Sequence, residues 1–435
     1  MTITTPIRTE AEATLLQAFE SLKDTLPGDA RARQAAIDLF AAQGLPHRRV
    51  ESWHYTDLRA AMPTAAPVRG PAPAADAPPR DALTQGVRLV VLDGAFRPDL
   101  SDMDRVPPGV RVRPLATALA EDDGFIPDPL LAQNDSVVAL NTALVRDGVV
   151  IDVAAGTDVE ETLVIATALS GGAAQAGFAR SVVRVGEAAS VTIVEDSSTL
   201  AAGPAQTNEA LVLTLGAQSK VSHVARVSHG DDKAIHLHSL LVDQADASDL
   251  QSFVLVADGG LVRRQIFARL IGQYAVIGLS GLSLLDGGRH ADVTLVVDHV
   301  VPHGQSREFF RYILEGESTG VYQGKVVVRP GAQKTDGAMK SNALVLNEGA
   351  TMYNKPELEI FADDVVCGHG ATVAQLDEDQ LFYLMARGLP RPDAEALLVE
   401  AFGVEAIERV ADERLRDALS EGLRAWLARR GGAAA

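Results

Sequence analysis

The residue types that can bind a metal ion are concentrated in one short segment of the chain. Residues 355–370 contain three carboxylates, a thiol and an imidazole: Glu357, Glu359, Asp363, Cys367 and His369. Side chains of a strand alternate between its two faces, so if this segment is one strand, all five lie on one face. Thiolate and imidazole suit iron, zinc and copper, so Cys367 and His369 are candidate ligands of one metal ion or cluster iron. Alternatively, Cys367 is a small core residue and His369 a hydrogen-bonded turn residue.

Cys367 is the only cysteine of the chain. An iron–sulfur cluster needs about four thiolates or substitute ligands. We therefore expect the isolated chain to bind no stable cluster, and any cluster or iron at this segment to be shared with a partner. A single cysteine also excludes a disulfide within the chain and fits a reducing, cytoplasmic compartment.

The sequence lacks the usual motifs of nucleotide hydrolysis and of serine hydrolases. The segment Gly320–Val326 resembles a phosphate loop, but it has three residues between its glycines, and Val326 replaces the Ser or Thr that holds magnesium. No Gly-x-Ser-x-Gly elbow is present. The sequence therefore offers neither a phosphate loop for ATP nor an anchor for a serine-hydrolase triad.

Two pairs of histidines on expected strands are further candidate metal ligands: His236 with His238, and His299 with His303. Pairs of this kind on strands usually face solvent. We therefore interpret them as surface residues and not as ligands.

A third polar group precedes the first expected strand. It consists of Arg48, Arg49, Trp53, His54 and Tyr55. These residues either bind a partner or fix the N-terminal helices to the core, and we favour the second interpretation.

The elements that position these residues divide the chain into four parts. Helical periodicity predicts an N-terminal helical domain over 1–62, and a Pro- and Ala-rich stretch over 63–85 predicts a linker. Short apolar runs bounded by Gly, Asp or Asn predict a β core over 86–375, and helical periodicity returns over 376–435.

A weak internal repeat indicates the architecture of this core. The phrases Gly186–Val194 and Gly216–Val224 align 30 residues apart, and short phrases beginning at Gly331, Gly349 and Gly370 repeat the same turn pattern. Repeats of about 20–50 residues are typical of stacked folds. The pattern favours a β-solenoid over a sandwich, a barrel or a propeller.

The charge excludes several classes of partner. Lys and Arg number 39 and Asp and Glu 58, which gives a formal net charge of −19. A chain this acidic does not attract nucleic acid or anionic lipid. The sequence contains no secretion signal and no apolar run of about 18 residues, so we expect neither secretion nor membrane insertion.

A long stretch of the sequence resembles a known family. Lys334–Gly337, Asn342 and Lys355–Val373 look like the signature of the SufB/SufD family of the SUF iron–sulfur cluster assembly system, and Gln375–Leu389 continues the likeness. The single cysteine and the segment Glu51–Thr56 resemble the SufD branch more than the SufB branch.

The resemblance implies a right-handed parallel β-helix flanked by helical domains. It also implies a complex in which this chain pairs with a SufB-like protein through the β-helices, while its C-terminal helices bind a SufC-like ATPase. The functional histidine of the family falls on His369, although Gly368 replaces the usual serine beside it. The expected ATPase-binding residues are Phe382, Tyr383, Leu384 and Arg387.

Two other interpretations remain. The chain could be a β-solenoid enzyme acting on a carbohydrate or an acyl substrate, although a lyase of that kind normally carries a secretion signal and an acyltransferase shows hexapeptide periodicity. It could also form a structural homodimer when alone.

Overall fold

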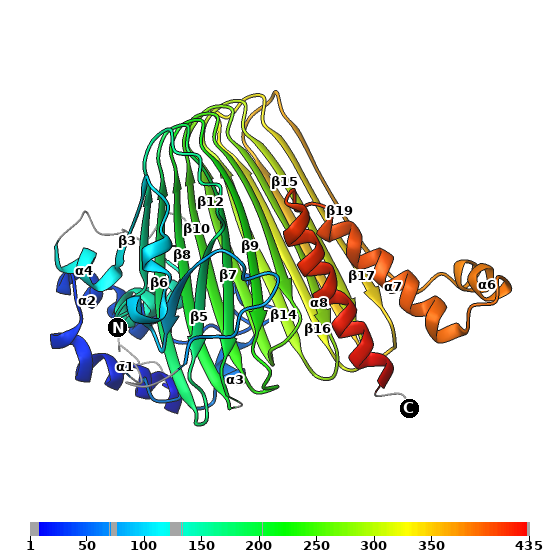
Figure 1. Cartoon of the computed structure of the whole chain (residues 1–435), viewed down its shortest axis with the longest axis horizontal. Helices are drawn as coiled ribbons and strands as arrows, with labels where there is room; N and C mark the ends of the chain where they lie inside the picture. Colours follow the sequence, from blue (N-terminus) through cyan, green and yellow to red (C-terminus); the bar gives the residue numbers. More distant parts are fainter. Residues whose placement is uncertain are drawn as a thin grey trace, which may run out of the picture.

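The computed structural model describes residues 8–432, except residue 69 and residues 71–75, 122–131, 133 and 202. Its central feature is a parallel β-solenoid of about eight turns (Figure 1). From β4 onward, successive strands alternate between a nine-stranded and a ten-stranded sheet, so each turn of the chain adds one strand to each sheet. The predicted β-solenoid with flanking helices is therefore confirmed.

The strands of the ten-stranded sheet are β1 (Val87–Leu92), β2 (Ala95–Phe96), β5 (Leu163–Leu169), β7 (Ser190–Thr199), β9 (Lys220–Ser228), β11 (Asp249–Val256), β13 (Val276–Leu285), β15 (Gln305–Leu314), β17 (Asp336–Val345) and β19 (Val366–Ala374). Those of the nine-stranded sheet are β3 (Val110–Pro114), β4 (Val149–Val153), β6 (Gln175–Val185), β8 (Ala205–Leu215), β10 (Ile235–Gln244), β12 (Leu261–Leu270), β14 (His290–His299), β16 (Thr319–Val328) and β18 (Thr351–Ile360). The α-helices are α1 (Glu10–Leu22), α2 (Ala30–Gln43), α3 (Leu58–Ala61), α4 (Leu115–Ala120), α5 (Ser136–Leu144), α6 (Glu378–Ala386), α7 (Arg391–Ile407) and α8 (Glu413–Gly432).

The internal repeat corresponds to one turn of the solenoid. Ser190 pairs with Lys220 and Val191 with Val221 in the parallel register of β7 and β9, as the sequence alignment requires. A corner before each of six strands contains a residue other than glycine with a φ between 53° and 65°: Ala188, Gln218, Ala247, Tyr274, His303 and Lys334. The phrase beginning at Gly370 was expected to repeat a turn, but it lies inside β19, so that part of the repeat is wrong.

The interior of the solenoid is filled by the inward-facing residues of both sheets. Val, Leu, Ile and Ala predominate there, and almost every one is fully buried. Parallel strands covered on both faces form such continuous apolar cores. Because each strand contacts its counterparts one turn away, every turn depends on its neighbours for burial.

The segment between α2 and α3 fixes the N-terminal helices to the outer face of the nine-stranded sheet. Trp53 is 1% exposed, and the guanidinium carbon of Arg263 lies 3.7 Å from the centre of its ring. Arg263 also donates a hydrogen bond to the carbonyl oxygen of Ser52 at 2.7 Å. The ring of Tyr55 stacks on Tyr353 of β18 with 4.7 Å between centroids. This confirms the anchoring interpretation, although three residues of the group are exposed: Arg48, Arg49 and His54.

Of the Pro- and Ala-rich linker expected over 63–85, residue 69 and residues 71–75 lie outside the described residues. Before it, α3 ends at Ala61, and after it β1 begins at Val87.

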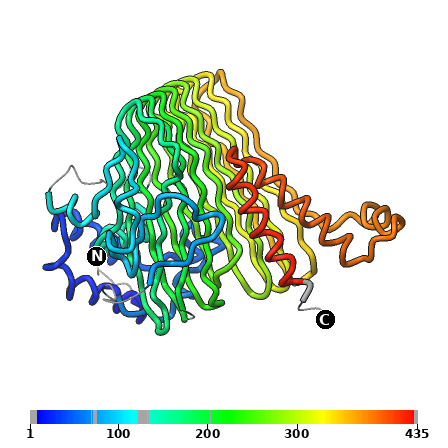
Figure 2. Tube along the Cα trace, viewed as in Figure 1, coloured from blue at the N-terminus to red at the C-terminus, as the bar shows by residue number. Residues whose placement is uncertain are grey.

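The C-terminal helices cover the outer face of the ten-stranded sheet. In Figures 1 and 2, α7 and α8 lie across the sheet near β15, whereas α6 projects away from the solenoid. Arg311 of β15 donates a hydrogen bond to the carbonyl oxygen of Phe402 at 2.6 Å and pairs with Glu405 of α7. Four residues of α8 at helical spacing are fully buried: Leu415, Leu419, Leu423 and Trp426.

The two ends of the solenoid differ. At the first end, the antiparallel strands β2 and β3 close the sheets. At the other end, β18 and β19 pair on one side only, since no strand among the described residues pairs with their outer edges. Among the helices of the described part of the chain, none combines the length and the apolar character that a membrane span requires.

Candidate functional site

The segment 355–370 is not one strand, so the single acidic face expected for it is wrong. β18 ends at Ile360 and β19 begins at Val366 in the other sheet. The chain turns between them because Ala362 packs into the apolar core at 7% exposure and Val365 packs against the same core. The carboxylates of β18 therefore belong to a different sheet from Cys367.

The three carboxylates of this segment have other surroundings. Glu359 forms an ion pair with Lys325 at 2.5 Å, and Glu357 lies 3.4 Å from the ammonium of Lys355. Asp363 is exposed in the turn between the two strands. They do not form a common acidic surface with the thiol and the imidazole.

Cys367 and His369 do lie on one face of β19, as expected. They are in parallel register with Gly337 and Met339 of β17, and Met339 belongs to the buried core. Both side chains therefore face the interior of the solenoid at its open end. Cys367 is half-buried, whereas His369 is exposed because no further turn covers it. The imidazole is accessible to an ion or a partner at this end.

Two acidic residues that the sequence analysis missed influence the thiol. Burial raises the pKa of Cys367, and the negative charges of Asp336 and Glu308 raise it further. Glu308 is 2% exposed, and burial raises its own pKa to about 8. Glu308 is in register with Met339 of β17, and Met339 is in register with His369. Aligning the sequence by the length of one turn would therefore have placed Glu308 on the same inward row as His369.

The open end also exposes apolar side chains. Val373 of β19 is 55% exposed, whereas Ala343 and Tyr312, its register partners one and two turns earlier, are 2% and 0% exposed. Val366 is 72% exposed, and Phe361 in the turn between β18 and β19 is 58% exposed. The last turn therefore lacks the cover that every earlier turn receives.

Helix α6 presents a second apolar surface. Phe382 is 73% exposed and Tyr383 57% exposed, while Leu381 is buried. Arg387 donates a hydrogen bond to the hydroxyl oxygen of Tyr383 at 3.0 Å, and its guanidinium carbon lies 4.9 Å from the ring centroid. Leu384 is half-buried. These residues therefore do not serve to pack the helices onto the solenoid.

The histidine pairs do not face solvent as expected. His236 and His238 are 1% and 4% exposed and point into the interior from β10, and His299 is 0% exposed. His303 is half-buried and stacks on Tyr274 with 4.6 Å between centroids. In this interior, Glu195 accepts a hydrogen bond from His238 at 3.1 Å, and Nδ1 of His236 lies 2.7 Å from the hydroxyl oxygen of Thr207.

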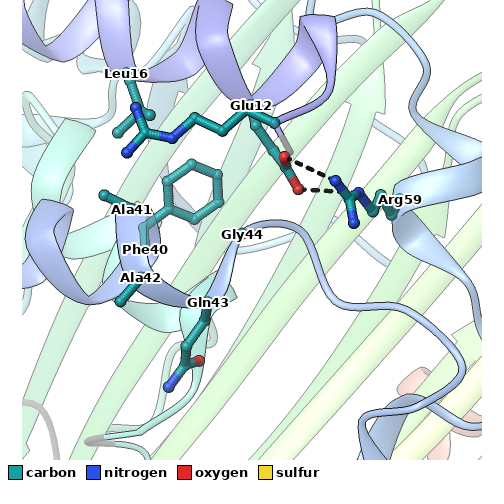
Figure 3. Close-up of a pocket in the computed structure, with 9 residues that line it drawn as sticks. Glu12, Leu16, Phe40, Ala41, Ala42, Gln43, Gly44 and Arg59 are labelled. Carbon is teal, nitrogen blue, oxygen red and sulfur yellow. Dashed lines mark hydrogen bonds and ion pairs between the residues drawn. The ribbon is translucent and has the colours of Figure 1, made fainter. Parts of the chain in front are cut away.

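A pocket between α1, α2 and the chain that follows α2 is structural (Figure 3). Its central carboxylate, Glu12, accepts hydrogen bonds from the backbone N–H groups of Thr9 at 2.8 Å and Leu45 at 2.9 Å. Arg59 lies 3.3 Å from the same carboxylate. Both oxygens of Glu12 are thus engaged in holding the N-terminal helices together.

Comparison with known proteins identifies the family of this chain. Residues 167–402 match the family model described as the SufBD core domain of SUF system FeS cluster assembly, and residues 81–165 match the SufBD protein N-terminal region. The chain belongs to the SufBD family of the SUF iron–sulfur cluster assembly system.

Within this family, the similarity to SufD is extensive. The chain is 28% identical to the iron–sulfur cluster assembly protein SufD of Escherichia coli over 399 residues, which cover 89% of this chain and 91% of that protein. It is 28% identical to a SufBD family protein of Synechocystis, over 87% of this chain and 86% of the relative. The chloroplastic protein ABCI7 of Arabidopsis thaliana is 30% identical over 48% of this chain and 44% of its own length.

Proposed function

We propose that this chain is a non-catalytic scaffold subunit of a cytoplasmic iron–sulfur cluster assembly complex, with the role of SufD. The observation that supports this role is the open end of the solenoid. There, no strand of the described residues pairs with the outer edges of β18 and β19, and β19 carries His369 and Cys367. A potential ligand at an uncovered edge gains further ligands when a second chain covers that edge.

The partner at this end is a SufB-like protein with a solenoid of its own. Unpaired strand edges present rows of backbone N–H and C=O groups that a second sheet can extend. The exposed side chains of Val366 and Val373 add apolar surface to the same edge. Iron or a nascent cluster, as the cargo of the complex, would be held between His369, Cys367 and ligands of the partner.

The second partner is a SufC-like ATPase that binds α6. Phe382 and Tyr383 give this short helix an apolar surface that the solenoid does not cover. The ATPase hydrolyses ATP for the complex, because the sequence of this chain has no phosphate loop that could bind the nucleotide.

The decisive experiment compares two lysine substitutions in a co-expressed complex with the SufB-like and SufC-like proteins. Val373→Lys places a charge on the inward face of the open end, and Ile271→Lys places one at a solvent-exposed corner, where Ile271 is 44% exposed. We expect gel filtration to show loss of the SufB-like subunit with Val373→Lys and an intact complex with Ile271→Lys. Intact assembly of the Val373→Lys protein would contradict docking at the open end.

A further inference from the structure

A second cluster of potential metal ligands lies inside the solenoid, far from the open end. Glu209 of β8, His236 of β10 and His229, which follows β9, each offer one ligand atom, and these atoms lie within 4.8 Å of one another. Their side chains are buried, with residue exposures of 7%, 1% and 1%. Three strands separate β10 from β18, so the cluster lies about 19 Å from the last turn at the usual strand spacing.

Hydrogen bonds orient both imidazoles so that one nitrogen of each is left without a partner. Nδ1 of His236 lies 2.7 Å from the hydroxyl oxygen of Thr207, and Nε2 of His229 lies 3.0 Å from that of Ser197. The remaining nitrogens, Nε2 of His236 and Nδ1 of His229, are buried and have no hydrogen-bond partner in the described part of the chain. Ligating histidines are usually held in this way, by a hydrogen bond on the nitrogen opposite the metal.

The carboxylate belongs to the same network. Ser197 donates a hydrogen bond to Oε1 of Glu209 at 2.9 Å, so one hydroxyl connects Glu209 to His229. Because this hydroxyl donates to Glu209, it accepts from the Nε2–H of His229, which leaves the lone pair of Nδ1 for a metal ion.

A neighbouring buried carboxylate, that of Glu195, has a histidine partner for each of its two oxygens. Both oxygens of Glu195 are engaged, one with His223 at 2.9 Å and the other with His238 at 3.1 Å. Burial alone would raise the pKa of Glu195, but these histidines hold it well below its usual range. Glu209, by contrast, accepts a hydrogen bond from Ser197 at Oε1 and from no histidine among the described residues.

We propose that Glu209, His229 and His236 form an internal binding site for one divalent transition-metal ion, such as Fe²⁺ or Zn²⁺. Two histidines and one carboxylate are a donor set that suits both ions. The ion would connect the nine-stranded sheet, through β8 and β10, to the corner that follows β9. His229 precedes Gly230, which is exposed to solvent. An ion therefore needs to pass only the corner that follows β9 to reach the site.

The test uses the untagged full-length chain, stripped of metal with a chelator and then incubated with Co²⁺ under anaerobic conditions. Bound cobalt is measured by mass spectrometry after desalting, and its visible absorption reports coordination by protein ligands. We expect about one Co²⁺ per chain and a higher melting temperature with the metal, because binding to the folded state alone stabilises that state.

Three variants localise the site. The double substitution Glu209→Gln with His236→Gln should abolish the absorption bands. Ser197→Ala, a smaller change that removes only the orienting hydroxyl, should weaken Co²⁺ binding about 10–100-fold. The matched control is His299→Gln, because His299 is also fully buried in the interior, has no partner for either ring nitrogen among the residues that the structure describes, and is not part of the cluster. It should leave Co²⁺ binding unchanged.

His369→Ala separates this site from the open end. Retention of one Co²⁺ in this variant supports the internal site whether or not the proposed docking at the open end is correct. Loss of the metal in His369→Ala, or equal binding by the wild type and the double variant, would assign the ion elsewhere and overturn the proposal. A wild-type chain that binds no Co²⁺ would also overturn it and would leave buried water as the occupant of the cluster.

Discussion

His369 and Cys367 occupy adjacent inward positions on β19 but have unequal access to an incoming ion. The exposed imidazole is accessible to an ion without rearrangement of the chain, whereas the half-buried thiol is less accessible and must lose a proton before it can bind one. Burial and the charges of Asp336 and Glu308 oppose that loss. His369 is therefore the stronger candidate ligand.

We predict that His369→Ala lowers the cluster content of the complex with the SufB-like and SufC-like proteins and leaves its assembly intact. An exposed side chain makes little contribution to packing, so the fold should tolerate its removal. Cys367→Ala should have a smaller effect. Iron and sulfide content, measured on complexes isolated by gel filtration, tests both. A wild-type cluster content in His369→Ala would exclude it as a ligand, and failed assembly would indicate a structural role.

The raised pKa of Cys367 predicts slow alkylation at neutral pH. Because only the thiolate reacts, a raised pKa means less reactive species at any pH below it. The rate of reaction with iodoacetamide should therefore rise at a higher pH than for a cysteine in an unstructured peptide. Glu308→Gln removes one of the charges that raise this pKa, so it should move the profile to lower pH. An unchanged pH dependence of the alkylation rate in Glu308→Gln would show that the charge of Glu308 does not affect the pKa of Cys367.

At the scale of the elements, the anchoring of the N-terminal helices depends on Trp53. This side chain is enclosed by the sheet and by Arg263, which also binds the backbone beside it. We predict that Trp53→Ala destabilises the protein by about 3–5 kcal/mol, as for other buried tryptophans. Arg49→Ala, an exposed change in the same segment, should have almost no effect. Urea denaturation monitored by circular dichroism compares the two, and equal stability of both variants would contradict the anchoring role.

Helix α6 should be necessary for binding the ATPase but not for folding. Phe382→Asp with Tyr383→Ser removes the exposed apolar surface while it preserves Leu381, which is buried. We predict loss of the SufC-like protein on co-purification with an unchanged melting temperature. Leu397→Asp on α7 is a suitable control, because Leu397 is 48% exposed on another helix. Undiminished binding by the α6 variant would exclude this surface as the docking site.

The solenoid could be predicted from the sequence because each turn repeats a short local pattern of apolar residues and corner residues. The 30-residue offset between Gly186 and Gly216 matches the pairing of Ser190 with Lys220. The corner between β18 and β19 could not be predicted from local pattern. Alternation continues through it, and the bend depends on Ala362 filling a core built from earlier turns.

The internal polar cluster was missed for a related reason. His236 and His238 alternate on a strand in the manner of solvent-facing residues, and only the folded structure shows that they lie in the interior, with Glu195 bonded to His238 and Glu209 near His236. Buried polar groups need hydrogen-bond partners, which here come from strands one to two turns away in the sequence. Aligning the turns by their period would have placed Glu209 beside His238, since the two are in register on β8 and β10.

For the whole molecule, the contrast between the closed first end and the open last end determines what the isolated chain can do. Each turn of a solenoid is stabilised by its neighbours, and terminal turns normally need a cap. Antiparallel β2 and β3 provide one at the first end, but β18 and β19 have none among the described residues. Among the described residues, the isolated chain therefore exposes the backbone N–H and C=O groups of two strand edges at this end.

We predict that the isolated chain binds no stable iron–sulfur cluster after anaerobic reconstitution with iron and sulfide. Two copies meeting at their open edges would bring only one cysteine each, still fewer than the roughly four thiolates or substitutes that a cluster needs. Absorption and iron-to-sulfide ratio should show no stoichiometric cluster in either the monomer or a dimer fraction, whereas the complex with the SufB-like protein should retain one. The comparison must be made on chains carrying Glu209→Gln and His236→Gln as well, so that iron bound at the internal site is not counted as cluster iron. A stoichiometric cluster on the isolated chain would mean that carboxylates or histidines replace the missing thiolates, and the open end would then be a complete site without a partner.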